Sequence, residues 1–380
     1  MTEFSLPQGL WVGRVWRSGI GPCVVTVRAG HVFDITSKAA PTMRDLLELP
    51  DIAGFVDSVP GEDLGPLDAL KSASIEAAGD ATRLLAPCDL QAIKACGVTF
   101  ARSMVERVIE ERAAGNPALA AEIRMRVAGV IGDSLRDLVP GSAKAAEVKA
   151  LLQAEGLWSQ YLEVGIGPDA EVFTKAQPMA AVGFGASVGL HPISKWNNPE
   201  PEVVLVVNSK GQIVGATLGN DVNLRDVEGR SALLLGKAKD NNAAASIGPF
   251  IRLFDGAFTL DTVRGLELSL TVTGEDGFAL QGQSSMRQIS RDPADLVAQT
   301  RGRHHQYPDG FVLYCGTMFS PVQDRDGPGQ GFTHHLGDVV TISAPELGSL
   351  RNTVRLSTEA PEWQFGSGAL MRNLAARGLL

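Results

Sequence analysis

Three carboxylates in one short stretch, residues 200–221, are spaced so that they could bind a metal ion together. Glu200 and Glu202 are two positions apart, so on a strand both side chains point to the same face. The sequence NSKG at 208–211 is a turn signal, after which the chain returns toward Asp221. A loop with an even number of residues would place Asp221 on the face of the two glutamates, whereas a three-residue loop would turn it away.

Like charges packed this closely repel one another and raise one another's pKa unless a cation lies between them. Carboxylate oxygens without a nearby cysteine or histidine favour hard cations, so we expect Mg²⁺, with Mn²⁺ or Ca²⁺ as alternatives. A solvated strand of an acidic protein can carry the same spacing without binding any metal. Spacing alone therefore leaves both interpretations open.

The elements that must position these carboxylates are mostly short strands. After Trp158, β-branched runs such as 203–207, 266–272 and 339–342 alternate with turns rich in Gly, Asn, Asp and Pro. Many short strands with few helices are typical of a large antiparallel or mixed β fold.

A helical insert is expected before this β-rich part, at about 99–156. Apolar residues recur at helical spacing from Phe100 to Ile109. Ser103 and Glu106, three positions apart, are expected on one face of this helix.

The sequence pattern in the first part of the chain predicts a small separate domain. Runs rich in β-formers at 23–28 and 31–35 flank an Ala-Gly turn, which indicates a hairpin, and the stretch 60–80 has the composition of a linker. We therefore expect an α+β chain that is mostly β, with a small N-terminal α+β domain at 1–83 and a large domain at 84–380.

Charge and composition exclude several classes of protein. The 380 residues carry 34 Lys and Arg against 43 Asp and Glu, a net charge of −9, which argues against nucleic acid or an anionic membrane as the main partner. Neither an apolar run of about 18 residues nor a basic start followed by an apolar segment is present, so we expect no membrane span and no secretion. Four scattered cysteines fit a reducing, cytoplasmic setting.

Three blocks of sequence, PEPEVVLVV, GNDVNLRD and GKAKDNNAAASIGPF, resemble the fumarylacetoacetate hydrolase superfamily in their order and spacing. The resemblance implies a large mixed β-sandwich or roll as the catalytic domain, with a helical lid. It also implies that the metal ligands are Glu200, Glu202 and Asp221, that Arg225 and Lys239 belong to the same site, and that the chain forms homodimers or homotetramers.

Two longer phrases, LWSQYLEVGIGPDAEVFTK and HQYPDGFVLYCGTMFSPVQDRD, are similar to the sugar-acid dehydratase branch of this superfamily. That likeness implies a 2-keto-3-deoxy-pentonate of the xylonate or arabinonate type as substrate and 2,5-dioxopentanoate as product. Hydrolytic members resemble one another in a His-x-x-Glu pair, where this chain has Ser103 and Glu106. The missing histidine removes the obvious base for a hydrolytic water.

A dehydratase of this kind needs a base near C3 and an acid for the C4 hydroxyl. Lys239 is the expected base, with a pKa lowered by burial or by nearby cations, and Glu106 is the expected acid, although the two roles could be exchanged. Four further residues are expected to contact the substrate: Ser103, Lys175, Arg225 and Ser343.

Other interpretations stay open. Glu106 could form an ordinary helix-surface pair with Arg102, and Arg225 could form a salt bridge with Asp226 or Glu228. The same metal site could serve a C–C hydrolase or decarboxylase of the acylpyruvate or fumarylacetoacetate type. A non-catalytic protein that binds sugar acids could also keep the cation as a structural clamp.

Overall fold

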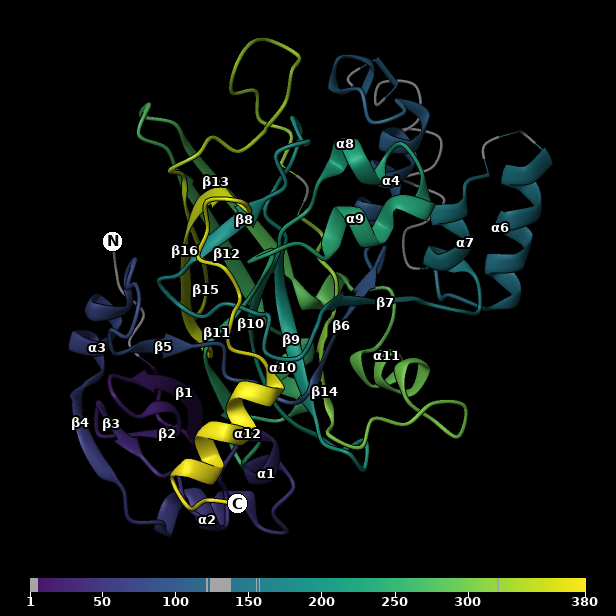
Figure 1. The fold of residues 1–380 in the computed structure, drawn as a ribbon. Coiled ribbons are helices and arrows are strands. Elements are labelled where there is room, and N and C mark those ends of the chain that lie inside the picture. The colour runs from purple at the N-terminus through teal and green to yellow at the C-terminus, as the bar shows by residue number, and fades with distance from the viewer. Residues whose placement is uncertain (1–5, 121, 124–137, 155, 157, 320) are drawn as a thin grey trace.

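The computed structural model describes residues 6–120, 122–123, 138–154, 156, 158–319 and 321–380, and within them the fold consists mainly of two β-sheets with helices at their margins (Figure 1). The strand-rich fold class expected from the sequence is confirmed. No helix in the described ranges is long and apolar enough to cross a membrane.

The larger sheet has eleven strands in the spatial order β4-β3-β2-β1-β11-β10-β9-β14-β6-β7, with β5 paired to β1. Their bounds are β1 (Trp11–Arg17), β2 (Gly21–Arg28), β3 (His31–Asp34), β4 (Glu62–Pro66), β5 (Arg83–Leu85), β6 (Ala92–Gly97), β7 (Glu171–Ala176), β9 (Pro201–Val207), β10 (Ile213–Asp221), β11 (Ala245–Leu253) and β14 (Phe311–Tyr314).

The smaller sheet has five strands in the order β13-β12-β15-β16-β8. They are β8 (Ser187–Leu190), β12 (Glu267–Thr273), β13 (Ala279–Ser285), β15 (Val339–Ala344) and β16 (Gly348–Leu356).

The helices are α1 (Met43–Leu47), α2 (Ile52–Ser58), α3 (Leu67–Ser74), α4 (Ala101–Arg112), α6 (Ala143–Ala154), α7 (Gln160–Ile166), α8 (Arg225–Glu228), α9 (Leu235–Lys239), α10 (Leu260–Arg264), α11 (Pro293–Thr300) and α12 (Ser367–Ala376), with 3-10 turns η1 (Ala232–Leu234) and η2 (Met286–Gln288). Figure 1 shows α4, α6, α7, α8 and α9 gathered on one side of the larger sheet.

Strand β9 lies in the centre of the larger sheet and is buried along its whole length. Its odd-numbered valine and leucine side chains join the core that also contains Leu270 of β12 and Ile342 of β15. Its even-numbered valines join a second core that contains Met43 and Leu46 of α1. The run of apolar residues thus covers both faces of one central strand, and its charged start, at Glu200 and Glu202, lies at the edge of the core.

The N-terminal strands continue the larger sheet, because β1 pairs with β11 through Trp11 and Arg252. The domain boundary predicted between residues 83 and 84 falls inside β5, and the division into two domains stays a prediction. The stretch 60–80, expected as a linker, instead forms β4 and α3. Helix α3 is held by an amphipathic face that buries Leu67 and Leu70.

Helix α4 forms where the apolar spacing predicted it, with Met104, Val108 and Ile109 buried against α7 and its neighbours. The predicted insert at about 99–156 contains α4 and α6, and part of it lies outside the described residues. Its role as a lid stays a prediction.

Candidate active site

The hairpin β9–β10 brings the three predicted metal ligands together, although its loop does not have the even number of residues that the sequence analysis required. Five residues, 208–212, separate the paired ends of the strands, and this odd number alone would turn Asp221 to the other face. A bulge between Ile213 and Gly215 shifts the register by one residue. The backbone N–H of Asp221 consequently donates to the carbonyl of Glu200 over 3.1 Å.

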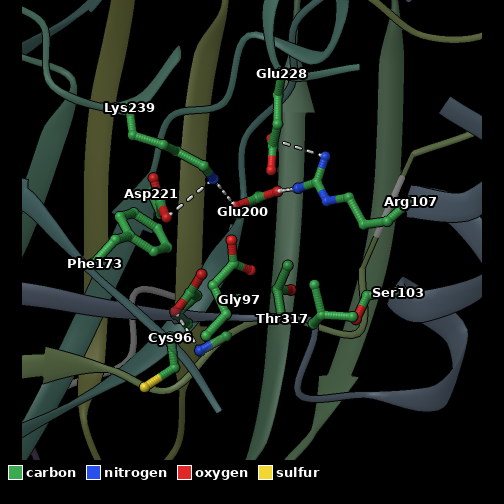
Figure 2. Close-up of a pocket in the computed structure, with 14 residues that line it drawn as sticks. Cys96, Gly97, Ser103, Arg107, Phe173, Glu200, Asp221, Glu228, Lys239 and Thr317 are labelled. Carbon is green, nitrogen blue, oxygen red and sulfur yellow. Dashed lines mark hydrogen bonds and ion pairs between the residues drawn. The ribbon is translucent and has the colours of Figure 1, made fainter. Parts of the chain in front are cut away.

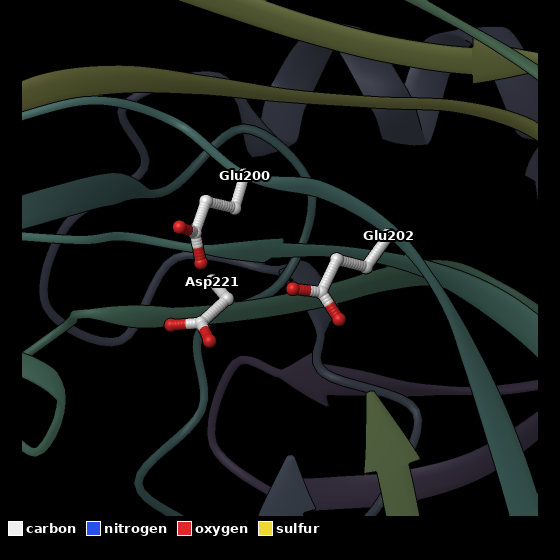
Figure 3. Close-up of side chains that lie close together, drawn as sticks. All are labelled: Glu200, Glu202 and Asp221. Carbon is white, nitrogen blue, oxygen red and sulfur yellow. The ribbon is translucent and has the colours of Figure 1, made fainter. Parts of the chain in front are cut away.

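The three carboxylates form a buried cluster, in which one oxygen from each lies within 4.8 Å of the others (Figure 3). Glu200, Glu202 and Asp221 are at most 4% exposed. Burial, followed by the charges of Asp221 and Glu200, raises the pKa of Glu202 well above its ordinary value. Glu202 has no ion-pair partner among the described residues, and three carboxylates with hard oxygen donors are a donor set that suits Mg²⁺, Mn²⁺ or Ca²⁺.

Lys239, at the end of α9, reaches between two members of the cluster (Figure 2). Its Nζ donates to Glu200 Oε2 at 2.7 Å and to Asp221 Oδ2 at 3.1 Å. Burial alone would lower the pKa of Lys239, but the surrounding carboxylates outweigh burial, and the pKa lies above the usual range of a lysine. The expected lowering of this pKa is therefore wrong for this arrangement.

Lys175, expected to contact the substrate, lies behind Asp221 and is fully buried. Its Nζ is 2.7 Å from Asp221 Oδ1 and donates to the carbonyls of Val222 and Lys239. Burial lowers its pKa although Asp221 opposes that change. With its donors directed at these groups, Lys175 does not line the cavity at the cluster, and it acts as a support for Asp221.

The residues of helix α4 that line the cavity differ from the pair Ser103 and Glu106 that the sequence analysis predicted. Ser103 and Arg107 line the cavity. Glu106 does not line it, and its Oε2 lies 3.6 Å from Nη2 of Arg225. The helix turns this carboxylate toward α8, so the described residues do not place Glu106 at the cavity wall, and its role as the catalytic acid stays a prediction.

Arg225 likewise takes a structural position. Its Nε donates to Glu110 Oε1 at 2.7 Å, its Nη1 donates to the carbonyl of Pro321, and its guanidinium lies 4.3 Å from the ring centroid of Trp196. The arginine binds α4 through Glu106 and Glu110, and it does not line the cavity. The structure does not bring Arg225 to the cavity wall, and its contact with the substrate stays a prediction.

Ser343 lies on β15 of the smaller sheet, paired with Ser269 and Ser349 on the neighbouring strands. It is not among the residues that line the cavity, so the structure does not bring this predicted contact to the site. A hydroxyl is supplied there instead by Thr317, which follows β14.

The cavity has about 20 Å³ of space open to the centre of a water molecule, and the groups that line it come from one half of the larger sheet, β10, β9, β6 and β7 with the residues after β14, and from helices α4, α8 and α9 (Figure 2). The lining residues are Cys96, Gly97, Val98, Ser103, Arg107, Glu171, Phe173, Glu200, Glu202, Asp221, Glu228, Lys239, Gly316 and Thr317.

Glu171, at the start of β7, is a lining carboxylate that the sequence analysis missed. It pairs in register with Gly97, where a Cβ atom would lie 1.9 Å from Glu171 Oε2, so the glycine leaves room for the carboxylate. Burial and the charge of Glu228 raise the pKa of Glu171 to about 7. Its spacing to Lys175 on the same strand, four positions, was the signal available in the sequence.

Arg107 and Glu228 were also missed, and they form one ion-paired group. Arg107 Nη2 donates to Glu200 Oε1 at 2.5 Å, and its Nη1 donates to Glu110 Oε2 at 2.6 Å and lies 3.0 Å from Glu228 Oε2. Burial raises the pKa of Glu228, and Arg107 opposes the rise. Arg107 lies one helical turn after Ser103, a spacing that places both on one face.

Two dehydratases of other organisms are similar to the chain in sequence. The chain is 28% identical over 256 residues to a probable 2-keto-3-deoxyxylonate dehydratase of Haloferax volcanii, covering 67% of this chain and 84% of that protein. It is 29% identical over 185 residues to the 2-dehydro-3-deoxy-D-arabinonate dehydratase of Saccharolobus solfataricus, covering 49% of this chain and 58% of that protein.

Solved structures share the fold. The apo form of a 2-keto-3-deoxy-D-arabinonate dehydratase superposes with a TM-score of 0.64 at 19% identity, covering 91% of this chain and 99% of that chain. The same type of enzyme complexed with magnesium and 2,5-dioxopentanoate gives 0.62 at 19% identity with the same coverage. Residues 163–355, just over half of the chain, match the family described as fumarylacetoacetate (FAA) hydrolase C-terminal, and the chain belongs to that family.

Proposed function

We propose that this chain is a metal-dependent dehydratase that converts a 2-keto-3-deoxy-pentonate to 2,5-dioxopentanoate. The observation that carries the proposal is one cavity that joins the carboxylate cluster to Lys239 and Glu171, while no histidine is among the described residues that line it. The names of the relatives from Haloferax volcanii and Saccharolobus solfataricus support the same reaction class.

Glu200, Glu202 and Asp221 are the proposed ligands of a hard divalent cation, with Mg²⁺ as the first candidate. A cation held there would act as a Lewis acid toward the keto and carboxylate oxygens of a 2-keto acid. Lys175 fixes Asp221 from behind, and Arg107 fixes one oxygen of Glu200.

Glu171 and Lys239 are the proposed groups that move protons during water loss. The pKa of Glu171, raised to about 7, leaves a carboxylate available at neutral pH that can take a proton from C3. Lys239 is kept protonated by its carboxylate neighbours, so its ammonium can donate to the C4 hydroxyl as the C–O bond breaks. In this proposal Lys239 has the acid role that the sequence analysis gave to Glu106, and Glu171 has the base role that it gave to Lys239.

A coupled assay that follows aldehyde formation from both C4 epimers, with and without Mg²⁺, tests this function. We expect aldehyde only with the metal, loss of turnover in Glu202→Gln, and normal turnover in a matched Glu275→Gln variant, since Glu275 is exposed. Turnover that survives exhaustive chelation would contradict the metal role. Cleavage of an acylpyruvate in place of pentonate dehydration would establish the hydrolase instead.

The homodimer or homotetramer implied by the family resemblance stays a prediction, which light scattering on the purified chain would check. The cytoplasm is the proposed compartment; the four cysteines, all free and buried, are compatible with it.

A further inference from the structure

The proposed reaction has two chemical stages, of which the proposed roles of Glu171 and Lys239 cover only the first. Removal of a proton from C3 and of hydroxide from C4 gives 5-hydroxy-2-oxopent-3-enoate. The product 2,5-dioxopentanoate contains the same atoms, so the second stage is an isomerisation. In it C5 and its hydroxyl each lose a proton, while C3 and C4 each gain one, and no external oxidant is needed because the alkene is reduced as the alcohol is oxidised.

Glu228 is a carboxylate of the same cavity that the first stage does not use. It is 3% exposed and ends the short helix α8, where its backbone N–H donates to the carbonyl of Leu224. Its own carbonyl accepts from the hydroxyl of Tyr161 at 3.3 Å. The backbone that carries this side chain is therefore fixed from two sides.

Arg107 gives Glu228 a permanent cationic partner. The guanidinium is held by Glu110 at 2.6 Å and by Glu200 at 2.5 Å, and it approaches Glu228 Oε2 at 3.0 Å. Arginine is not deprotonated in proteins, so it stabilises the carboxylate without competing for a proton. Glu171, in contrast, has no ion-pair partner among the residues that the structure describes.

We propose that Glu228 is a further catalytic residue, which removes the C5 proton in the second stage, and that Arg107 is the positioning residue that holds its carboxylate at the cavity wall. This inference rests on the proposed function.

The C5–H bond breaks and its electron pair forms a C4–C5 double bond, while the C3–C4 double bond shifts toward C2. C3 then takes up a proton, and the enol left at C4–C5 gains a proton on C4 and loses its hydroxyl proton to give the aldehyde.

Glu228→Gln tests the proposal through the ratio of aldehyde formed to pentonate consumed, both followed in the same reaction. The wild-type ratio is expected to be one to one. In the variant we expect the ratio to fall by about 10²-fold or more, the range over which a missing acid–base group acts, while a conjugated enone accumulates and is detected by its ultraviolet absorbance. Glu275→Gln, the same change at an exposed position, should keep the wild-type ratio.

Two further variants separate catalysis from structure. Glu228→Asp keeps the charge but withdraws the carboxylate, so it should lower the same ratio and serves if the glutamine variant does not fold. Arg107→Met should lower the ratio as well, and Arg107→Lys should restore part of it, a rescue that a merely structural role would not produce.

The outcomes distinguish the two proposals. If the wild-type protein consumes no pentonate, both the proposed function and this inference are overturned. If the wild type is active and Glu228→Gln forms aldehyde in step with pentonate consumption, at whatever rate, only the role of Glu228 is overturned.

Discussion

Replacing Glu171 by glutamine should change how the stability of the metal-free protein depends on pH. The pKa of Glu171 is raised from 4.5 to about 7, first by burial and then by the charge of Glu228. A folded-state pKa above the unfolded value means that the folded protein holds more protons between these two pH values. The wild-type protein should therefore lose stability as the pH rises through this window, and Glu171→Gln, which cannot ionise, should lose less.

The magnitude follows from the shift. At about 1.4 kcal/mol per pKa unit, the full change from 4.5 to about 7 corresponds to roughly 3 kcal/mol, of which about 2.5 kcal/mol falls between pH 5 and pH 8. Glu171 is only half-buried, and screening by the solvent that reaches it reduces this figure to about 1–2 kcal/mol.

Urea denaturation of the wild type and Glu171→Gln, in EDTA at pH 5 and pH 8, measures the difference. EDTA is needed because a bound cation would lower the pKa of nearby carboxylates. Glu275→Gln provides the control for an exposed glutamate. Parallel stability curves for the wild type and Glu171→Gln would refute the reasoning, as would a variant that loses more stability than the wild type toward high pH.

Three further predictions follow from the same geometry. Mg²⁺ binding should release protons, since the pKa of Glu202 is raised well above its ordinary value and a cation lowers it; calorimetry in buffers of different ionisation enthalpy would show this release, and its absence in the wild type would contradict it. Lys175→Met should lower the free energy of unfolding by about 3–5 kcal/mol, because Asp221 loses a buried partner; an unchanged urea midpoint would refute that role. Glu106→Gln should leave kcat within about a factor of three, because Glu106 does not line the cavity; a large fall in kcat at unchanged stability would return Glu106 to the catalytic group.

From the sequence, Asp221 is expected on the face of Glu200 and Glu202 only if the hairpin loop has an even number of residues. The structure does not meet this condition. The loop between β9 and β10 is odd in length, and the bulge after Ile213 compensates for it. A bulge depends on how two strands pack against their neighbours, and no residue type at Ile213 or Gly215 announces it. The block order that resembles the family predicted the cluster of Glu200, Glu202 and Asp221 because it is independent of loop length.

In helix α4, the spacing of the residues did not determine which of them lines the cavity together with Ser103. Ser103 and Glu106 lie roughly 60° apart around a helix axis, and Ser103 and Arg107 roughly 40° apart on the other side. Helical periodicity therefore allows either neighbour to share the cavity with Ser103. The position of Arg225 decides, because it attracts Glu106 and Glu110 and leaves Arg107 facing Glu200. This contact joins residues more than a hundred positions apart, which a local pattern does not record.

The charges of the buried network argue for a divalent rather than a monovalent cation. Among the described residues, three cationic side chains face the five carboxyl groups that line the cavity: Arg107, Lys175 and Lys239 against Glu171, Glu200, Glu202, Asp221 and Glu228. With all five carboxyl groups ionised, the carboxylates exceed the cations by two. A divalent cation cancels this excess, whereas a monovalent one would leave an uncompensated buried charge, at a cost of several kcal/mol. A proton taken up by Glu171 in the loaded site would change this balance by one charge, so bound substrate that accepts or gives a proton there changes the charge balance of the whole cavity. The protonation state of Glu171 and the charge of the bound cation are therefore coupled, because both enter the same balance of buried charge.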